Sequence, residues 1–287
     1  MENTFDLKII GGGIAGLSCG IHAQKLGLKS IIIEKDKLPK KKICGGLFTT
    51  KSKLLYEHLL EEPLKFKYKD DTVILKYKDK WVSSDIKPIY FVDRVEISKQ
   101  MLNKYIQLGG IIAQIDNSKA DRTIYANGVN FSQINNGNYA FAIEQEWDED
   151  LITTEIEFLP EIKGYLWNFM TNIGIGGEVK YTKEILDKVK ELNLTNIKGT
   201  YLPYGNPLKD RDKIGDRANL CSPITGEGIY YAIKSGILAA ENKNHNSLVR
   251  KLKFEKVLVD FFYNHFDFCW KLLKINCIRK YFLYKFC

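Results

Sequence analysis

Hydrophobic and polar positions near the start of the chain follow the pattern of a strand, a turn and a helix. An apolar run, Leu7-Lys8-Ile9-Ile10, leads into Gly11-Gly12-Gly13-Ile14-Ala15-Gly16. Apolar residues then recur at the spacing of one helical face, namely Ile14, Leu17, Ile21 and Leu28. A second apolar run, residues 30–33, ends at Glu34. The pattern predicts a strand–turn–helix–strand unit over residues 7–34.

Further along the chain, helical and alternating patterns follow one another. Helical spacing covers residues 50–60, 95–108, 182–194 and 229–240. Strand-like runs cover residues 72–77, 89–92, 111–112 and 123–126, and residues 139–180 show the alternation of an antiparallel sheet. The fold class is therefore α/β, with a Rossmann-like nucleotide-binding domain, an antiparallel sheet domain and a short C-terminal helical tail.

The order of these patterns predicts a discontinuous nucleotide-binding domain. We assign to it residues 1–70, 88–137 and 196–243. Residues 71–87 and 138–195 form a sheet that covers the substrate, and residues 244–287 form the helical tail.

The first glycine turn has the spacing of a dinucleotide site. Gly11 makes the tight turn, Gly13 lets the backbone approach a pyrophosphate, and Gly16 lets helix and strand pack closely. The phosphates would lie on the helix N-terminus, whose unpaired N–H groups favour anions. Glu34 follows at the distance expected of an acid on a ribose hydroxyl, which disfavours NADP here. The alternative is a glycine turn without a ligand.

A second glycine turn lies about two hundred residues later. Gly215-Asp216 is followed by residues 222–228, Ser-Pro-Ile-Thr-Gly-Glu-Gly, which lead directly into the predicted helix 229–240. The N-terminus of that helix would stabilise the negative charge of a reduced flavin ring, and Asp216 would accept a hydrogen bond from a ribityl hydroxyl. Two such turns indicate an extended dinucleotide, FAD, held at both ends.

At these residues the chain resembles the geranylgeranyl reductase family of flavoproteins, which has the p-hydroxybenzoate hydroxylase-like fold. The resemblance covers about residues 5–240 and includes Lys42-Ile43-Cys44-Gly45-Gly46, Arg94 and residues 165–169, Tyr-Leu-Trp-Asn-Phe. It implies that Arg94 lies near FAD, that Cys44 lies beside the reactive ring, and that the aromatic strand lines the substrate cavity.

The motifs and the resemblance together give a set of candidate site residues. The cofactor-binding set is Gly11, Gly13, Ile14, Ala15, Gly16, Glu34, Lys35, Cys44, Gly45, Gly46, Arg94, Asp216, Gly226, Glu227, Gly228 and Ile229. The substrate cavity set is Tyr165, Trp167, Phe169 and Pro223. Cys44 is the candidate catalytic residue; the proton donor would be Cys44 or a water held nearby.

Each of these assignments has a structural alternative. Cys44 could be a small residue packed behind a tight turn, or a redox partner of Cys221. The alternating rings of residues 165–169 suit any half-buried sheet face. Two residues depart from the family: Asn127 replaces the usual acid, and Met170 the usual proline. The segment between Gly110 and Asn127 and the C-terminal region are also shorter.

The composition of the chain limits the kinds of partner that we expect it to bind. The chain has 287 residues, 45% hydrophobic and 27% charged, with a formal net charge of +8. Its lysines are dispersed without a nucleic-acid motif, so we expect no nucleic-acid partner. The six cysteines lack CxxC spacing and the four histidines form no metal pattern, so free thiols and no metal are expected. We expect a cytoplasmic protein.

The segment 251–287 is rich in aromatic residues and lysine. It predicts either a pair of helices packed on the sheet or an amphipathic element that contacts membrane lipid peripherally. Both can hold at once.

The sequence thus predicts an FAD-dependent reductase that saturates carbon–carbon double bonds of an isoprenoid or another apolar lipid. Electrons would come from a transiently docked donor, either a reduced nicotinamide or a ferredoxin-like protein. The alternatives are a monooxygenase or halogenase of the same fold, and a shortened non-catalytic flavin-binding protein.

Overall fold

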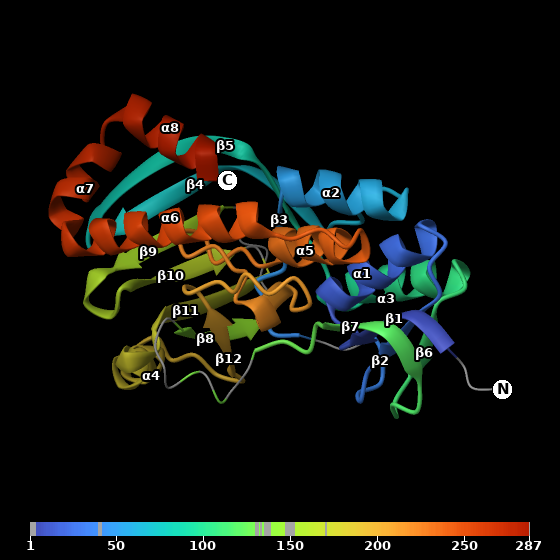
Figure 1. Ribbon diagram of the computed structural model, residues 1–287. Helices are drawn as coiled ribbons and strands as arrows, with labels where there is room; N and C mark the ends of the chain where they lie inside the picture. The colour runs from blue at the N-terminus through green and yellow to red at the C-terminus, as the bar shows by residue number, and fades with distance from the viewer. Residues whose placement is uncertain are drawn as a thin grey trace.

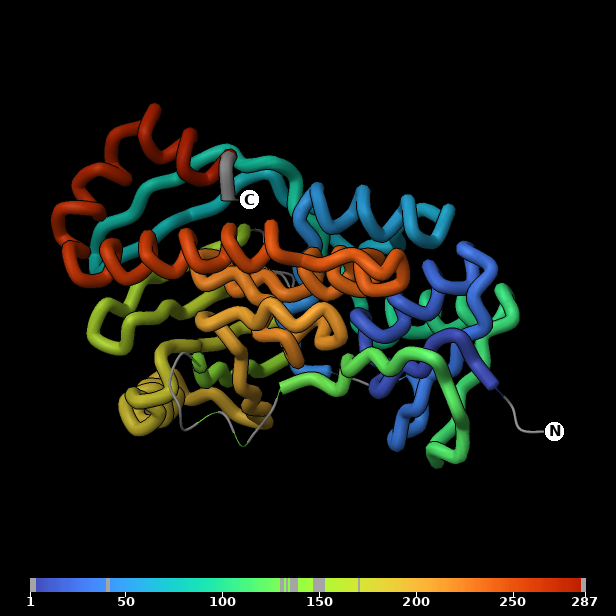
Figure 2. The backbone as a smooth tube through the Cα atoms, in the orientation of Figure 1, coloured from blue at the N-terminus to red at the C-terminus, as the bar shows by residue number. Residues whose placement is uncertain are grey.

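Two sheets build the protein, as the computed structural model shows (Figure 1). The structure describes residues 4–39, 42–129, 132, 134, 139–146, 153–169 and 171–286. Lys40, Lys41, Met170 and Cys287 lie outside these residues. The backbone trace in Figure 2 places the smaller sheet at the N-terminal end of the molecule and the C-terminal helices at the opposite end.

The smaller sheet is parallel and has the strand order β6-β2-β1-β7. Its strands are β1 (Thr4–Ile10), β2 (Ser30–Ile33), β6 (Ile111–Ala113) and β7 (Lys119–Tyr125). Helix α1 (Ile14–Lys25) follows β1 and packs against α3 (Arg94–Gln107) and α5 (Ile229–Ala240). Ile9, Ile32 and Leu17 are fully buried between strands and helices. The predicted strand–turn–helix–strand unit is confirmed.

The larger sheet has eight strands in the order β12-β8-β11-β10-β9-β4-β5-β3. Their bounds are β3 (Leu47–Thr49), β4 (Tyr68–Tyr77), β5 (Lys80–Phe91), β8 (Tyr139–Glu146), β9 (Thr154–Leu159), β10 (Gly164–Phe169), β11 (Asn172–Glu178) and β12 (Lys198–Pro203). All pairs are antiparallel except β4 with β9. The predicted antiparallel sheet is confirmed and extends well beyond residues 139–180.

Two strands join the larger sheet from segments that the sequence grouped with the nucleotide-binding part. β3 pairs with β5, and β12 pairs with β8. Both are short or at an edge, so their hydrophobic pattern does not specify a sheet. Further elements within the described residues are α2 (Thr50–Leu60), α4 (Thr182–Glu191) and the 3₁₀ helices Pro160–Ile162, Val179–Tyr181 and Gly215–Ala218.

The C-terminal tail consists of three helices rather than the predicted pair. They are α6 (Asn246–Asn264), α7 (Phe266–Leu273) and α8 (Asn276–Phe286). The chain leaves helical geometry at His265 and again after Lys274, which divides the tail. Aromatic rings join these helices to the large sheet: Phe158 of β9 lies 5.2 Å from Phe262 and 5.9 Å from Phe266 between ring centroids. The tail therefore packs against one face of the large sheet and covers it.

Candidate functional site

One cavity of about 740 Å³ extends between the two sheets and beneath the C-terminal helices. Both glycine turns line it. Every predicted site residue except Gly16 contributes to its walls: Gly11, Gly13, Ile14, Ala15, Glu34, Lys35, Cys44, Gly45, Gly46, Arg94, Tyr165, Trp167, Phe169, Asp216, Pro223, Gly226, Glu227, Gly228 and Ile229. Residues two hundred positions apart thus share one cavity, while their individual roles stay predictions.

The first glycine turn brings the backbone close to the cavity. Gly11 has a φ of +111°, and a Cβ there would lie 2.5 Å from the carbonyl oxygen of Ala126. A Cβ on Gly13 would meet no atom within 4 Å, because this residue faces open space at the start of α1. A Cβ on Gly16 would lie 1.9 Å from the carbonyl oxygen of Gly11. Gly16 therefore lies behind the cavity wall, where it permits close packing.

Glu34 lies at the end of β2, on the cavity wall. Its Oε2 accepts a hydrogen bond from the Gly12 N–H at 2.8 Å, and its Oε1 accepts one from the Asp36 N–H at 3.1 Å. The side chain is only 4% exposed. These bonds fix the carboxylate beside the first turn, at the position that the sequence predicted for a ribose-binding acid.

Cationic groups surround the middle of the cavity. Arg94, the first residue of α3, has its Nε and Nη1 buried with no hydrogen-bond partner among the described residues. Buried guanidinium donors without partners are costly unless an anion accepts from them. Lys42 forms an ion pair with Asp216, and attraction to this carboxylate raises the pKa of Lys42. Arg94 is therefore the cationic group that can donate to a phosphorylated ligand, whereas the charge of Lys42 is balanced by Asp216.

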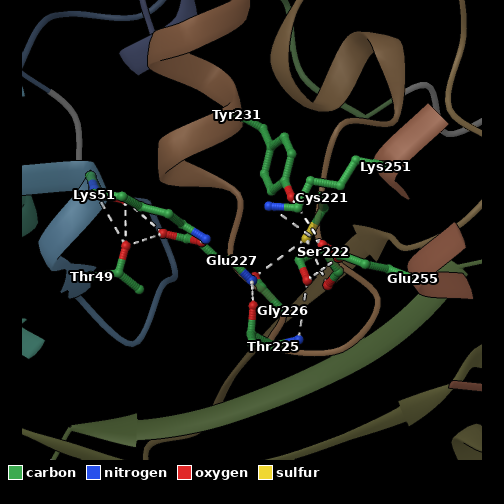
Figure 3. Close-up of polar contacts among 11 residues, drawn as sticks. Thr49, Lys51, Cys221, Ser222, Thr225, Gly226, Glu227, Tyr231, Lys251 and Glu255 are labelled. Atoms are coloured by element: carbon green, nitrogen blue, oxygen red, sulfur yellow. Dashed lines mark hydrogen bonds and ion pairs between the residues drawn. The ribbon is translucent and has the colours of Figure 1, made fainter. Parts of the chain in front are cut away.

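The second glycine turn is a closed loop over residues 222–228 (Figure 3). The Gly226 N–H donates to the Ser222 carbonyl at 2.9 Å, and the Ser222 N–H donates to the Glu227 carbonyl at 3.0 Å. Gly226 has a φ of +68°, which glycine adopts without strain. Helix α5 begins at Ile229, so its free N–H groups start at this loop.

A buried carboxylate holds this loop on the side of α2. Oε1 of Glu227 accepts hydrogen bonds from the hydroxyls of Thr49 and Ser52, both at 2.6 Å. Nζ of Lys51 lies 2.6 Å from Oε2 of the same carboxylate. Thr49 also caps α2, since its Oγ1 accepts from the Ser52 N–H. The sequence pointed to Glu227 but gave no sign of these partners.

A second buried carboxylate holds the loop from the opposite side, as Figure 3 shows. Glu255 of α6 is 2% exposed and accepts a hydrogen bond from the Ser222 hydroxyl at 2.6 Å. The Tyr231 hydroxyl donates to the same carboxylate at 3.3 Å, and Lys251 Nζ lies 3.7 Å from it. Burial raises the pKa of Tyr231, so its hydroxyl remains a donor. Sequence reasoning missed Glu255 because nothing in the sequence placed the tail beside the loop.

The three rings of β10, Tyr165, Trp167 and Phe169, all reach the cavity. Trp167 Nε1 donates to Asn172 Oδ1 at 2.7 Å, and Asn172 Nδ2 donates to the carbonyl of Gly45 at 3.1 Å. Asn172 thereby ties the aromatic strand to the paired glycines after Cys44. Gly174 of β11 belongs to this packing, since a Cβ there would lie 2.1 Å from the Trp167 ring.

The two cysteines near the cavity differ in environment. Cys44 is partly exposed, and its N–H donates to Glu144 Oε1 at 3.0 Å. Cys221 is buried, its Sγ lies 3.3 Å from the Gly226 carbonyl, and burial raises its pKa well above the usual value. Both thiols are free in the structure. Both cysteines line the cavity, and Cys44 is the more exposed of the two.

The far end of the cavity is apolar. The large sheet contributes Val73, Leu75, Ile156 and Phe158, and the C-terminal helices contribute Leu258, Phe262, Leu273 and Leu283. The helical residues were absent from the predicted substrate set, because the register of the tail on the sheet cannot be read from the sequence. Among the described residues, no group of three His, Cys, Asp or Glu side chains could hold a metal ion.

Comparison with known proteins bears on what this cavity holds. Residues 6–46 match the family described as FAD binding domain. The solved geranylgeranyl bacteriochlorophyll reductase-like protein of Thermoplasma acidophilum is similar in fold, with a TM-score of 0.72 and 18% identity over 93% of this chain and 83% of that one. The fold is that of the FAD-dependent oxidoreductases.

Two further proteins are similar to this FAD-dependent oxidoreductase fold. The flavin-dependent brominase Bmp2 has a TM-score of 0.66 and 17% identity over 96% of this chain and 92% of that one. An uncharacterized protein of Methanosarcina barkeri is 24% identical over 94% of this chain and 86% of its own length. The likeness extends over nearly all of each protein.

FAD is the cofactor, and the cavity fits it. The open backbone at Gly13, the partnerless donors of Arg94 and the carboxylate of Glu34 are what a dinucleotide's phosphates and ribose require. Asn127, which stands where the resemblance leads us to expect an acid, also lines the cavity. Its amide keeps an acceptor oxygen and adds an NH2 donor, so the site still has a polar group there.

Proposed function

We propose that this FAD-dependent oxidoreductase saturates carbon–carbon double bonds of an isoprenoid or another apolar lipid. The observation that carries the proposal is the apolar end of the cavity, which is continuous with the end lined by residues 222–228 and Cys44. Its walls present aliphatic and aromatic side chains from the sheet and from the C-terminal helices. Such walls suit a hydrocarbon chain and offer little to a polar substrate.

Reduced FAD, when bound, supplies a hydride to one alkene carbon. The Cys44 thiol donates the proton that the other carbon needs, because it is the more exposed of the two thiols on the cavity wall and burial raises the pKa of the other, Cys221. Trp167 and Phe169 exclude water from the same region. Glu227 and Glu255 hold the loop 222–228 in place from two sides.

The reductant has to reach the flavin from outside. Among the described residues the parallel sheet forms a single nucleotide unit, and the cavity is the site assigned to FAD. A transiently docked donor, either a reduced nicotinamide or a ferredoxin-like protein, fits this arrangement. Stopped-flow reduction by each donor in turn identifies it.

An anaerobic turnover experiment tests the proposal. The FAD-loaded protein is reduced without oxygen and then mixed with isoprenoid lipids in detergent, while absorbance reports flavin reoxidation and mass spectrometry reports a gain of two hydrogens. We expect both signals, and about a hundredfold slower reoxidation in Cys44→Ala. Cys277→Ala, at an exposed thiol, is the matched control. A reduced protein that no lipid reoxidises would support a non-catalytic flavin-binding protein instead.

The similarity to a flavin-dependent brominase favours a second candidate, a monooxygenase or halogenase. In that case the reduced protein would react with oxygen before the substrate. Oxygen uptake coupled to product formation, with no alkene reduction under anaerobic conditions, would decide for this candidate.

A further inference from the structure

Helix α6 carries apolar side chains on two opposite sides. Its inner side chains, Val259 and Tyr263 among them, line the cavity. On its outer side Phe254, Val257 and Phe261 are 57%, 65% and 50% exposed. A helix on the surface of a globular protein usually has a polar outer face. The outer face of α6 departs from this pattern.

The exposed residues are aligned along the helix. Phe254, Val257 and Phe261 are three and four positions apart, so they lie on one stripe of α6. Phe268, in the next helix α7, is also exposed, at 56%. We call these four residues the outer stripe. A group of exposed large apolar side chains is typical of an interaction site.

Positive charge accompanies the outer stripe. Residues 244–287 contain nine lysines and arginines and three acidic residues, so this segment holds +6 of the chain's net +8. Two of the three acids are engaged, Glu255 with Ser222 and Asp260 with Lys256. Arg250, Lys253 and Lys271 are exposed. The surface therefore combines aromatic side chains with a cationic surround.

We propose that the outer stripe docks the protein on an anionic lipid bilayer. Anionic headgroups complement the cations, and the acyl boundary takes up the aromatic side chains. A second copy of the chain is a poorer occupant, because pairing two such stripes would bring like charges together. No helix among the described residues has the length and hydropathy of a transmembrane span, so the contact is peripheral.

This inference rests on the proposed function, since it explains how an apolar substrate reaches the cavity. One helix, about 10 Å across, separates the outer stripe from the cavity wall. A lipid would therefore travel only the width of α6 between the bilayer and the apolar end of the cavity. The exposed aromatic stripe and the cavity wall are two faces of one element.

Vesicle flotation tests the inference with the full-length protein. The probes are phosphatidylcholine vesicles with and without phosphatidylglycerol. We expect binding to the anionic vesicles that weakens as salt is raised, and about tenfold weaker binding by the double variant Phe254→Ser with Phe261→Ser. Ile115→Ser, which removes a 74% exposed side chain next to β6, is the matched control and should bind as the unchanged protein does.

Other outcomes would overturn the inference. One is that the double variant binds anionic vesicles as well as the unchanged protein does, and another is that neither protein binds them. A third is that the unchanged protein forms a concentration-dependent dimer and the double variant does not. The double variant should still reduce a lipid presented in detergent, because neither residue lines the cavity. If the double variant loses vesicle binding but still reduces the lipid, both proposals are supported. If the unchanged protein binds vesicles but reduces no lipid, only the proposed function fails.

Discussion

Arg94 illustrates how a single side chain indicates the charge of the ligand that a cavity binds. The guanidinium begins α3, reaches the cavity and leaves two buried nitrogen atoms without a partner among the described residues. A protein tolerates such donors where a bound anion satisfies them. The diphosphate of FAD is an anion of the required kind.

Replacing Arg94 by Gln should weaken FAD binding by about 10- to 100-fold, since a charge-assisted hydrogen bond contributes about 1.5–3 kcal/mol. Titration of the apoprotein, followed by quenching of FAD fluorescence, measures the change. Arg250→Gln, at an exposed arginine of α6, is the control and should leave the Kd unchanged. A Kd within twofold of the unchanged protein for Arg94→Gln would remove Arg94 from the cofactor site.

Cys44 should be protected by the cofactor. The thiol lines the cavity and is partly exposed, whereas Cys277 is exposed on α8. We expect FAD to slow alkylation of Cys44 by iodoacetamide at least about tenfold, because the bound ring would cover it. Peptide mass spectrometry measures both sites, and Cys277 should react equally with and without FAD. Equal rates at Cys44 would contradict its predicted place beside the ring.

Glu255 should stabilise the fold through the loop it holds. Glu255→Gln weakens the charge-assisted bond to Ser222, so the free energy of unfolding should fall by about 1–3 kcal/mol. Asp260→Asn on the same helix breaks a less buried pair with Lys256 and should cost less than about 1 kcal/mol. Urea denaturation compares the two. An equal loss for both variants would mean that the bond to the loop is unimportant for stability.

At the scale of elements, different glycines of the turn between β1 and α1 serve packing and FAD binding. Gly16→Ala should destabilise the protein by at least about 2 kcal/mol, because its Cβ would overlap the Gly11 carbonyl at 1.9 Å. Gly13→Ala has room in the fold and should cost less than about 1 kcal/mol. It should nevertheless weaken FAD binding, since the methyl group projects into the space for the pyrophosphate. Thermal unfolding and FAD titration measure both variants; a stable Gly16→Ala protein would be the contrary result.

The same region shows what a sequence can predict. Strand β1, helix α1, strand β2 and Glu34 follow the predicted order, because local hydrophobic spacing and glycine positions determine them. Helix α5 has the predicted bounds, 229–240, for the same reason. Elements with a strong local pattern were predictable, and so was the shared cavity that the two glycine turns line.

Features that depend on distant contacts were not predictable. Nothing in the local pattern of α6 indicates that Glu255 meets Ser222, or that Lys42 meets Asp216. The third tail helix and the helical wall of the cavity depend on how the tail packs on β4 and β9. Such side-chain partners are fixed by tertiary packing, which hydrophobic periodicity does not encode.

For the molecule as a whole, FAD binding should stabilise the folded state. Both glycine turns and residues of the large sheet line the cavity, so bound FAD would join segments that are far apart in the sequence. At an FAD concentration one hundred times the Kd, linkage stabilises the folded state by about 2.7 kcal/mol. We expect the Tm to rise by about 5 °C on loading. Differential scanning calorimetry of apo and loaded protein measures this, and an unchanged Tm would contradict the assignment.

The loop 222–228 lies between two buried carboxylates, and one of them belongs to the helix that roofs the apolar cavity. If α6 swings outward to admit a long chain, the bond between Glu255 and Ser222 is stretched. A displacement of α6 would therefore be transmitted to the loop 222–228, which leads into the N-terminus of α5. Substrate entry beneath α6 would then alter the same loop that we expect to contact the flavin.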